Sequence, residues 1–218
     1  MTDTRLTLVQ RGFVVMVRLM TRVAAGYDMH RIQEEMVRTL GVRGTMRLMK
    51  MGAELTSTLA GQLGDYTAQT LIAIAAMWNG CRYCVIGHNF SANLFRFRDT
   101  GSLGPLDEDD LVELMRLTDD ELHEALRQRF EASEPRLWHL VDRMFQLRFR
   151  DLDPVEPEDH LLKATLSYWE WLNECTIVLG VDAESGSVPA LGFMRASDRL
   201  VQTYREARRA ALGTRSGG

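Results

Sequence analysis

Two cysteines and a histidine stand close together in the segment from Asn79 to His88, which reads Asn-Gly-Cys-Arg-Tyr-Cys-Val-Ile-Gly-His. On an α-helix, Cys81 and Cys84 are three residues apart and share a face, so their sulfur atoms can meet. His88 lies one further turn along that face. Its imidazole can take the thiol proton or, as a cation, stabilise the thiolate. Two thiols within disulfide reach and an adjacent imidazole are the groups that reversible two-electron thiol chemistry requires.

The residue before the first cysteine supports this interpretation. Gly80 frees the backbone directly before an expected helix and so places Cys81 near the helix N-terminus. There the helix dipole and the unpaired N–H groups favour a thiolate over a thiol. The residues alone leave two other roles open. The three side chains are either core residues with a satisfied histidine, or zinc ligands completed by Cys175 or a distant histidine.

The segment from Gln69 to His88 resembles the signature of the AhpD-like alkylhydroperoxidases, a branch of the carboxymuconolactone decarboxylase superfamily. A looser similarity covers residues 172–180, which resemble the end of a late helix in the longer peroxidase-related members. The resemblance implies an all-helical fold that assembles as a dimer, trimer, hexamer or other small homo-oligomer. It also implies that Cys84 attacks the hydroperoxide, that Cys81 condenses with the resulting sulfenic acid, and that His88 belongs to the proton relay.

One position departs from the family pattern. A glutamate normally completes the relay twelve residues before the first cysteine, and this chain has Gln69 there. Glutamine keeps the hydrogen bonds but cannot take up a proton, so general-base assistance, typically worth ~10²–10⁴-fold in rate, is lost at this position. Asp65, one helical turn earlier, or Glu54 can replace the glutamate only if the fold brings a carboxylate near His88.

The resemblance and the dithiol together predict a thiol-dependent peroxidase or disulfide reductase, with Cys84, Cys81, His88 and Gln69 as its site. The expected partners are a hydroperoxide substrate and an external dithiol reductant, and no metal, haem or flavin is implied. Two alternatives stay open. The altered relay position and the separation of charge along the chain favour a helical, oligomeric binding protein with a weakly active dithiol. The superfamily also includes cofactor-free decarboxylases, which work without the cysteine pair.

The rest of the sequence predicts helices almost everywhere and no strand, because apolar residues recur at spacings of three or four. The fold class is therefore all-α, with about eight to ten helices. One AhpD-like domain is expected over residues 1–212, with its core motif at 65–98, a second helical half at 106–212 and a disordered tail at 213–218. The expected helices are 4–24, 28–40, 44–63, 65–78, about 82–97, a short one after Asp107, one behind a capping box at Thr118–Glu121, one through Trp138–Phe149, 158–179 and, after a loop at 185–189, 190–212.

Length and composition agree with one globular domain or two closely packed halves. The chain has 218 residues, of which 45% are hydrophobic and 26% are charged. Three cysteines do not suit a secreted disulfide scaffold, and a net charge of −4 gives no basic footprint for nucleic acid. The apolar run Phe13–Val17 is too short to span a bilayer, and the N-terminus does not resemble a secretory signal. The expected location is the cytoplasm.

Charge is distributed unevenly along the chain. Residues 1–52 carry a balance of +5, whereas the segment Asp107–Glu124 contains nine acidic residues and one basic residue. These segments are either solvated helix faces or surfaces that dock on complementary segments or subunits. The helix at 4–24 has apolar residues on one face and arginines on another. It is expected to pack against the body or a second subunit rather than on a membrane surface.

Overall fold

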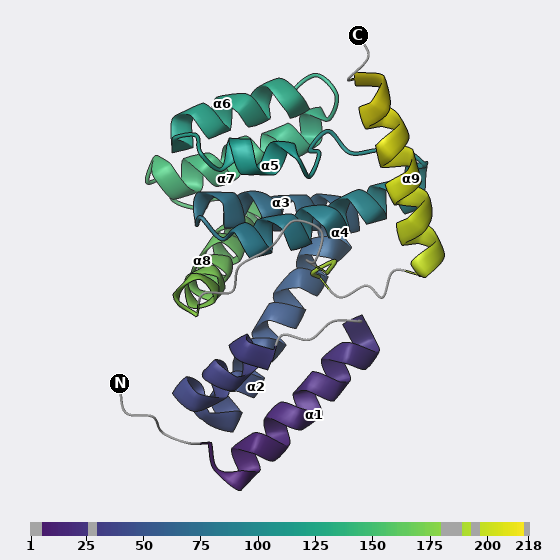
Figure 1. Cartoon of the computed structure of the whole chain (residues 1–218). Helices are drawn as coiled ribbons and strands as arrows, with labels where there is room; N and C mark the ends of the chain where they lie inside the picture. The colour runs from purple at the N-terminus through teal and green to yellow at the C-terminus, as the bar shows by residue number, and fades with distance from the viewer. Residues whose placement is uncertain (1–5, 26–29, 180–188, 193–196, 216–218) are drawn as a thin grey trace.

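The computed structural model describes residues 6–25, 30–179, 189–192 and 197–215. Within these residues the chain forms nine helices and no strand, which confirms the expected all-α class. In chain order the helices are α1 (Leu8–Ala25), α2 (His30–Leu63), α3 (Asp65–Trp78), α4 (Arg82–Thr100), α5 (Asp110–Leu114), α6 (Asp119–Phe130), α7 (Pro135–Phe149), α8 (Pro157–Val178) and α9 (Asp198–Arg215) (Figure 1).

Helix α3 lies at the centre of the molecule and is covered on all sides (Figure 1). Every residue from Ala68 to Trp78 is buried. A helix that is apolar around its whole circumference has no face to offer to water, so neighbours must cover it. Helices α2, α4, α7 and α8 all pack against it. The main hydrophobic core forms around this helix and includes both cysteines of the motif.

A partly buried ion pair fixes the start of α8, the helix that covers the candidate site. Arg143 on α7 bonds Asp159 in the first turn of α8 at 2.6 Å. The guanidinium of Arg143 holds the pKa of the Asp159 carboxyl far below its usual range. The same carboxylate accepts the backbone N–H of Glu156, which caps the helix. These contacts set the direction of α8 and therefore the placement of Trp169 and Thr176.

Helix α1 and the first part of α2 extend away from the body of the molecule (Figure 1). Val14 and Val17 of α1 are buried, whereas the opposite face of the helix exposes large apolar side chains. This exposed face of α1 consists of Leu8, Val9, Val15, Met16, Leu19, Met20 and Val23. None of the helices that the structure describes combines the length and the apolar character needed to cross a membrane.

One expected boundary near the motif changes, and another is confirmed. The separate helices expected at 28–40 and 44–63 join into α2, which bends at Gly41, where φ is +67°. The expected end before Gly41 is therefore a kink in one longer element. The helix expected at 65–78 has these bounds in the structure, with Asp65 as its first residue and Gly64 at the cap position. Asp65 places a negative charge in the first turn, where the helix dipole favours it.

The end of the chain differs most from the expectation of a helix at 190–212. Residues 189–192 form a non-helical segment, called the strap below, and α9 begins only at Asp198. The N–H of Leu191 donates to the Gly87 carbonyl at 3.0 Å, and the Ser91 hydroxyl donates to the Leu191 carbonyl. These tertiary hydrogen bonds hold the strap against α4 in place of helical ones.

The expected loop at 185–189 lies outside the described residues except for Pro189. At the C-terminus, α9 continues to Arg215, so the expected disordered tail at 213–218 is wrong for its first three residues. Adding a residue to a formed helix fixes only that residue, which makes such an extension inexpensive in entropy. The last three residues lie outside the described part of the chain.

The first acids of the segment Asp107–Glu124 pair with arginines of the same chain. Arg208 on α9 pairs with Asp107 at 2.7 Å and with Asp109 at 2.8 Å. Arg129 on α6 pairs with Asp110 at 2.6 Å. These pairs hold α9 against the connection that follows α4, and α6 against the start of α5. The later acids Asp119, Asp120, Glu121 and Glu124 are exposed on α6. Docking between segments therefore applies to the first part of the acidic segment, and a solvated helix face applies to the second.

Candidate functional site

The turn between α3 and α4 places both cysteines. Gly80 has φ +72°, a left-handed conformation that glycine adopts without a steric penalty. Its N–H bonds the Met77 carbonyl, and the Cys81 N–H bonds the Ala76 carbonyl, each at 3.0 Å. This pair of bonds is the Schellman motif that ends a helix. Cys81 then caps the start of α4, and Cys84 is the third residue of that helix. The expected position of the dithiol at a helix N-terminus is confirmed.

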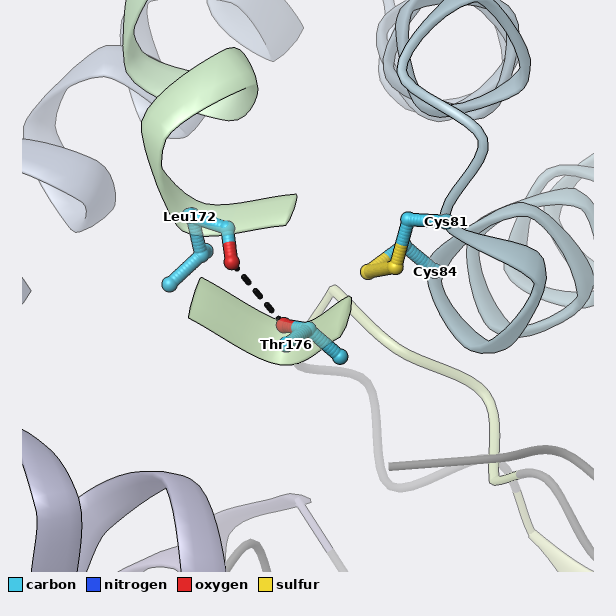
Figure 2. The surroundings of a disulfide bond; sticks show 4 residues. All are labelled: Cys81, Cys84, Leu172 and Thr176. Atoms are coloured by element: carbon cyan, nitrogen blue, oxygen red, sulfur yellow. Dashed lines mark hydrogen bonds between the residues drawn. A yellow bond between two sulfur atoms is a disulfide. The ribbon is translucent and has the colours of Figure 1, made fainter. Parts of the chain in front are cut away.

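Cys81 and Cys84 are joined by a disulfide, with their Cα atoms 5.4 Å apart. Both side chains are buried. Figure 2 shows the sulfur atoms on the side of α4 that faces Thr176 of α8, whose hydroxyl donates to the Leu172 carbonyl at 2.9 Å. Of the two cysteines, only Cys84 lines the neighbouring cavity, while Cys81 packs in the core. The two sulfur atoms therefore differ in their access to a ligand.

His88 lies one helical turn after Cys84 and lines the same cavity. Its Nδ1 atom is 2.8 Å from Oε1 of Gln69 on α3. Because an amide oxygen only accepts hydrogen bonds, Nδ1 carries the proton and Nε2 is left as a proton acceptor. The ring of Trp169 on α8 meets the imidazole edge-on, with the ring centroids 4.6 Å apart. Three helices thus fix the orientation of the histidine.

Burial sets the charge of this imidazole. It lowers the pKa of His88 to about 3, so the ring is neutral near physiological pH. The sequence left two roles open for His88, a base for the thiol or a cation beside the thiolate. A neutral ring with a free Nε2 fits the first role. It is a weak base, because protonation would place a charge in the core beside the neutral amide of Gln69.

Neither candidate carboxylate takes the place of the glutamate missing at position 69. Asp65 lines the cavity, but it pairs with Arg98 at 3.5 Å near the surface. Glu54 lies on the exposed side of α2, pairs with Lys50 at 3.6 Å and is absent from the cavity wall. The structure therefore brings together Cys81, Cys84, His88 and Gln69, keeps Asp65 on the same cavity and leaves Glu54 outside it.

A cavity of about 720 Å³ opens between α2, α3, α4, α8 and the strap. Its wall is largely apolar and includes Ile32, Met36, Met49, Ala53, Leu172 and Leu191. Ala53 and Ser57 of α2 are also exposed to solvent, so the opening lies along this helix. A ligand of moderate size can therefore reach Cys84 and His88 from outside.

The strap closes the cavity beside the relay pair. Gly87 and Gly192 have no side chains, and this lets the strap approach α4 and α3 closely. A Cβ atom on Gly87 would overlap Leu191, and one on Gly192 would overlap the Gln69 amide. Gly192 also has φ +106°, which L side chains rarely adopt. The strap thus supports Gln69 from the side opposite its own helix.

Several residues of the site were not foreseen from the sequence. Trp169, Leu172 and Thr176 reach the cavity from α8, and their spacing of three and four is the helical signal that could have grouped them. Gly192 and Gln33 also line the cavity, from segments far away in the chain. No local pattern marks either of these two residues.

The third cysteine stays outside the site. Cys175 is half-buried and does not line the cavity. Burial raises the pKa of its thiol. Within the described residues no three or more His, Cys, Asp or Glu side chains gather in a way that could hold a metal ion.

Comparison with models of protein families, with curated proteins and with solved structures finds no match to this chain. The resemblance to the AhpD-like peroxidases accordingly rests on the motif from Gln69 to His88.

Proposed function

We propose that the protein is a thiol-dependent peroxidase or disulfide reductase of the AhpD-like type, acting in the cytoplasm. The observation that carries this proposal is the difference in access between the two cysteines. Cys84 shares the cavity with His88, whereas Cys81 lies behind it within disulfide reach. An attacking thiol must meet the substrate, but a resolving thiol needs to reach only the first sulfur.

The proposed reaction begins with the reduced dithiol. Nε2 of His88 accepts the proton of Cys84, and the thiolate attacks the terminal oxygen of a hydroperoxide, ROOH. The O–O bond breaks, the alkoxide takes the proton and leaves as ROH, and Cys84 becomes a sulfenic acid. The thiol of Cys81 then attacks the Cys84 sulfur, water leaves and the disulfide forms. An external dithiol reduces this disulfide by exchange and is itself oxidised.

We also propose that the chain works as a homo-oligomer, a dimer, trimer or hexamer. Support comes from the exposed face of α1, where seven large apolar side chains lie in contact with solvent. An exposed apolar surface of this kind marks an interaction site. In an assembly, a second subunit would cover it.

The first test counts free thiols by intact mass in fully reduced protein, before and after an equimolar amount of cumene hydroperoxide. We expect two thiols and two hydrogen masses to be lost, with the new disulfide mapped to Cys81 and Cys84. Cys84→Ser should not react, and Cys81→Ser should stop at a sulfenic acid that dimedone traps. Cys175→Ser is the matched control and should react like the wild type. No change within minutes, or an undiminished reaction of Cys84→Ser, would rule out this mechanism.

A second candidate is a helical, oligomeric binding protein whose dithiol has little activity. The observation that favours it is the neutral pair of Gln69 and His88, which supplies no charge to activate a thiol. A titration of the Cys84 thiol in reduced protein separates the two candidates. A working peroxidase needs a thiol pKa well below the ordinary value of ~8.5, whereas the binding protein needs no such shift.

A further inference from the structure

One polar side chain on the cavity wall has an oxygen with no partner. Gln33 of α2 is 5% exposed and lines the cavity. Its Nε2 atom donates to the hydroxyl of Thr21 at 3.0 Å, and that hydroxyl donates to the Val17 carbonyl at 2.8 Å. The hydroxyl proton is therefore committed, so the oxygen of Thr21 must accept from the amide nitrogen of Gln33. This arrangement fixes the amide and leaves its oxygen, Oε1, without a partner in the described part of the chain.

A buried acceptor without a partner is unusual, because such groups are nearly always hydrogen-bonded in folded proteins. The same wall holds a second case of opposite polarity, the indole Nε1–H of Trp169, which also has no partner among the described residues. Around these two atoms the wall is mostly apolar. Among the described lining residues Asp65 is the one carboxylate, and none of them is a lysine or an arginine.

We infer that this cavity binds an uncharged, largely apolar organic molecule that donates a hydrogen bond to Oε1 of Gln33. The methionine and leucine side chains of the wall take the hydrocarbon part. A hydroxyl group fits the amide oxygen, because it supplies the missing donor without bringing a charge into the apolar space. A carboxylate group would lose its hydration there without meeting a lysine or arginine on the described wall. An ammonium group would meet only Asp65, which already pairs with Arg98.

The cavity ligand can be assigned as a substrate class only if the protein is a peroxidase, and this assignment therefore rests on the proposed function. The cavity also contains Cys84 and His88. The substrate is then a hydroperoxide of an apolar hydrocarbon that carries a hydroxyl group in addition to its O–O bond. Gln33, on α2, acts on binding and orientation, while the chemistry takes place at Cys84, on α4.

The test measures binding by calorimetry on the full-length, disulfide-bonded protein, so it requires no turnover. The two probes are 1-decanol, which can donate a hydrogen bond, and methyl decyl ether, which can only accept one. We expect the alcohol to bind about fivefold more tightly, as one net hydrogen bond implies. Gln33→Leu should remove this preference while still binding the ether. Ala53→Trp, which narrows the opening, should weaken the binding of both probes.

Thr21→Val keeps the inference testable if Gln33→Leu does not fold. Thr21 does not line the cavity, but its loss frees the Gln33 amide to rotate and should reduce the preference for the alcohol. Equal affinity for the two probes in the wild type, or a preference that survives in Gln33→Leu, would overturn the inference. So would the absence of binding, which would leave a cavity filled with water only. Failure of the peroxide reaction with alcohol binding intact would count against the proposed function alone.

Discussion

The chemistry at the scale of single residues turns on the pair of His88 and Gln69. The amide oxygen of Gln69 accepts from Nδ1 of the imidazole and leaves Nε2 free beside the cavity. The Gln69 amide thus orients the imidazole of His88 without placing a charge beside it. A carboxylate at position 69 would also stabilise the protonated ring, which burial disfavours here. The neutral pair makes His88 a well-placed but weak base for Cys84.

Gln69→Glu is therefore expected to accelerate the oxidation of Cys84 by cumene hydroperoxide. The new carboxylate raises the pKa of His88 and lets it hold the proton of the thiol, a contribution that typically reaches ~10²–10⁴-fold for general bases. The measurement is the second-order rate of thiol loss by stopped flow. In the His88→Asn background the same substitution should bring no gain. An acceleration that persists there would show that the carboxylate acts on another group.

The same histidine makes folding sensitive to acid. In the unfolded chain its pKa is ~6.5, and in the folded protein it is about 3. The unfolded state binds more protons between these values, so the free energy of unfolding falls as the pH falls below about 6.5. From pH 7 to pH 5 this one group costs about 2 kcal/mol. Urea unfolding at both pH values should show a loss about 2 kcal/mol smaller in His88→Asn. An equal loss in both proteins would contradict the buried, neutral histidine.

At the scale of elements, the site depends on two backbone features that hold α3, α4 and the strap together. The Schellman turn at Gly80 ends α3 and starts α4 at Cys81, which places the dithiol at a helix N-terminus. The strap then crosses α4 at Gly87 and contacts Gln69 through Gly192. Both features rely on glycine, the first for its left-handed conformation and the second for the missing side chain.

Gly192→Ala tests the role of the strap. The added methyl group overlaps the Gln69 amide, and a left-handed backbone costs a residue other than glycine about 1–2 kcal/mol. We expect lower stability in urea unfolding and a slower peroxide reaction, because Gln69 no longer holds His88 in place. Gly213→Ala, in α9, is the control, since its added Cβ atom meets nothing within 4 Å. This control should leave the reaction rate unchanged. An unchanged rate in Gly192→Ala would show that the strap does not contribute to the reaction at the site.

At the scale of the whole molecule, the exposed apolar face of α1 stands apart from the body that contains the site (Figure 1). Helix α1 packs mainly on α2, and α2 forms one wall of the cavity. An assembly that covers this face would therefore also stabilise α2, the cavity wall that carries Gln33. In contrast, Asp107 and Asp110 of the acidic segment already pair with arginines of the same chain.

Charged substitutions on this face are expected to lower the molar mass in solution. Val15→Glu and Leu19→Glu each place a carboxylate where an apolar contact between subunits would form. Light scattering after size-exclusion chromatography measures the change from oligomer to monomer. Val155→Glu is the matched control, because Val155 is a similarly exposed valine outside α1. A wild-type monomer, or an unchanged mass in both α1 variants, would contradict the proposed assembly.

The sequence by itself determined the all-α class, most helix positions and the dithiol with its histidine. These properties are local: apolar spacing, capping residues and glycine turns act over a few residues and can be read along the chain. The capping box at Thr118 and the helix N-terminus at Cys81 are examples that the structure confirms. The start of the last helix was predicted too early because hydrogen bonds to Gly87 and from Ser91, far away in the sequence, hold the strap in a non-helical conformation.

Only the tertiary structure decided which side chains meet at the cavity. Burial by Trp169 and its neighbours fixes the neutral state of His88, and packing places Cys84 on the cavity wall with Cys81 behind it. The spare acceptor on Gln33 arises from a hydrogen-bond chain between two helices. The access of a side chain to the cavity, its burial and its hydrogen-bond partners all depend on the residues that the fold packs around it. Those residues come from distant segments, and the order of residues along the chain does not reveal which segments meet.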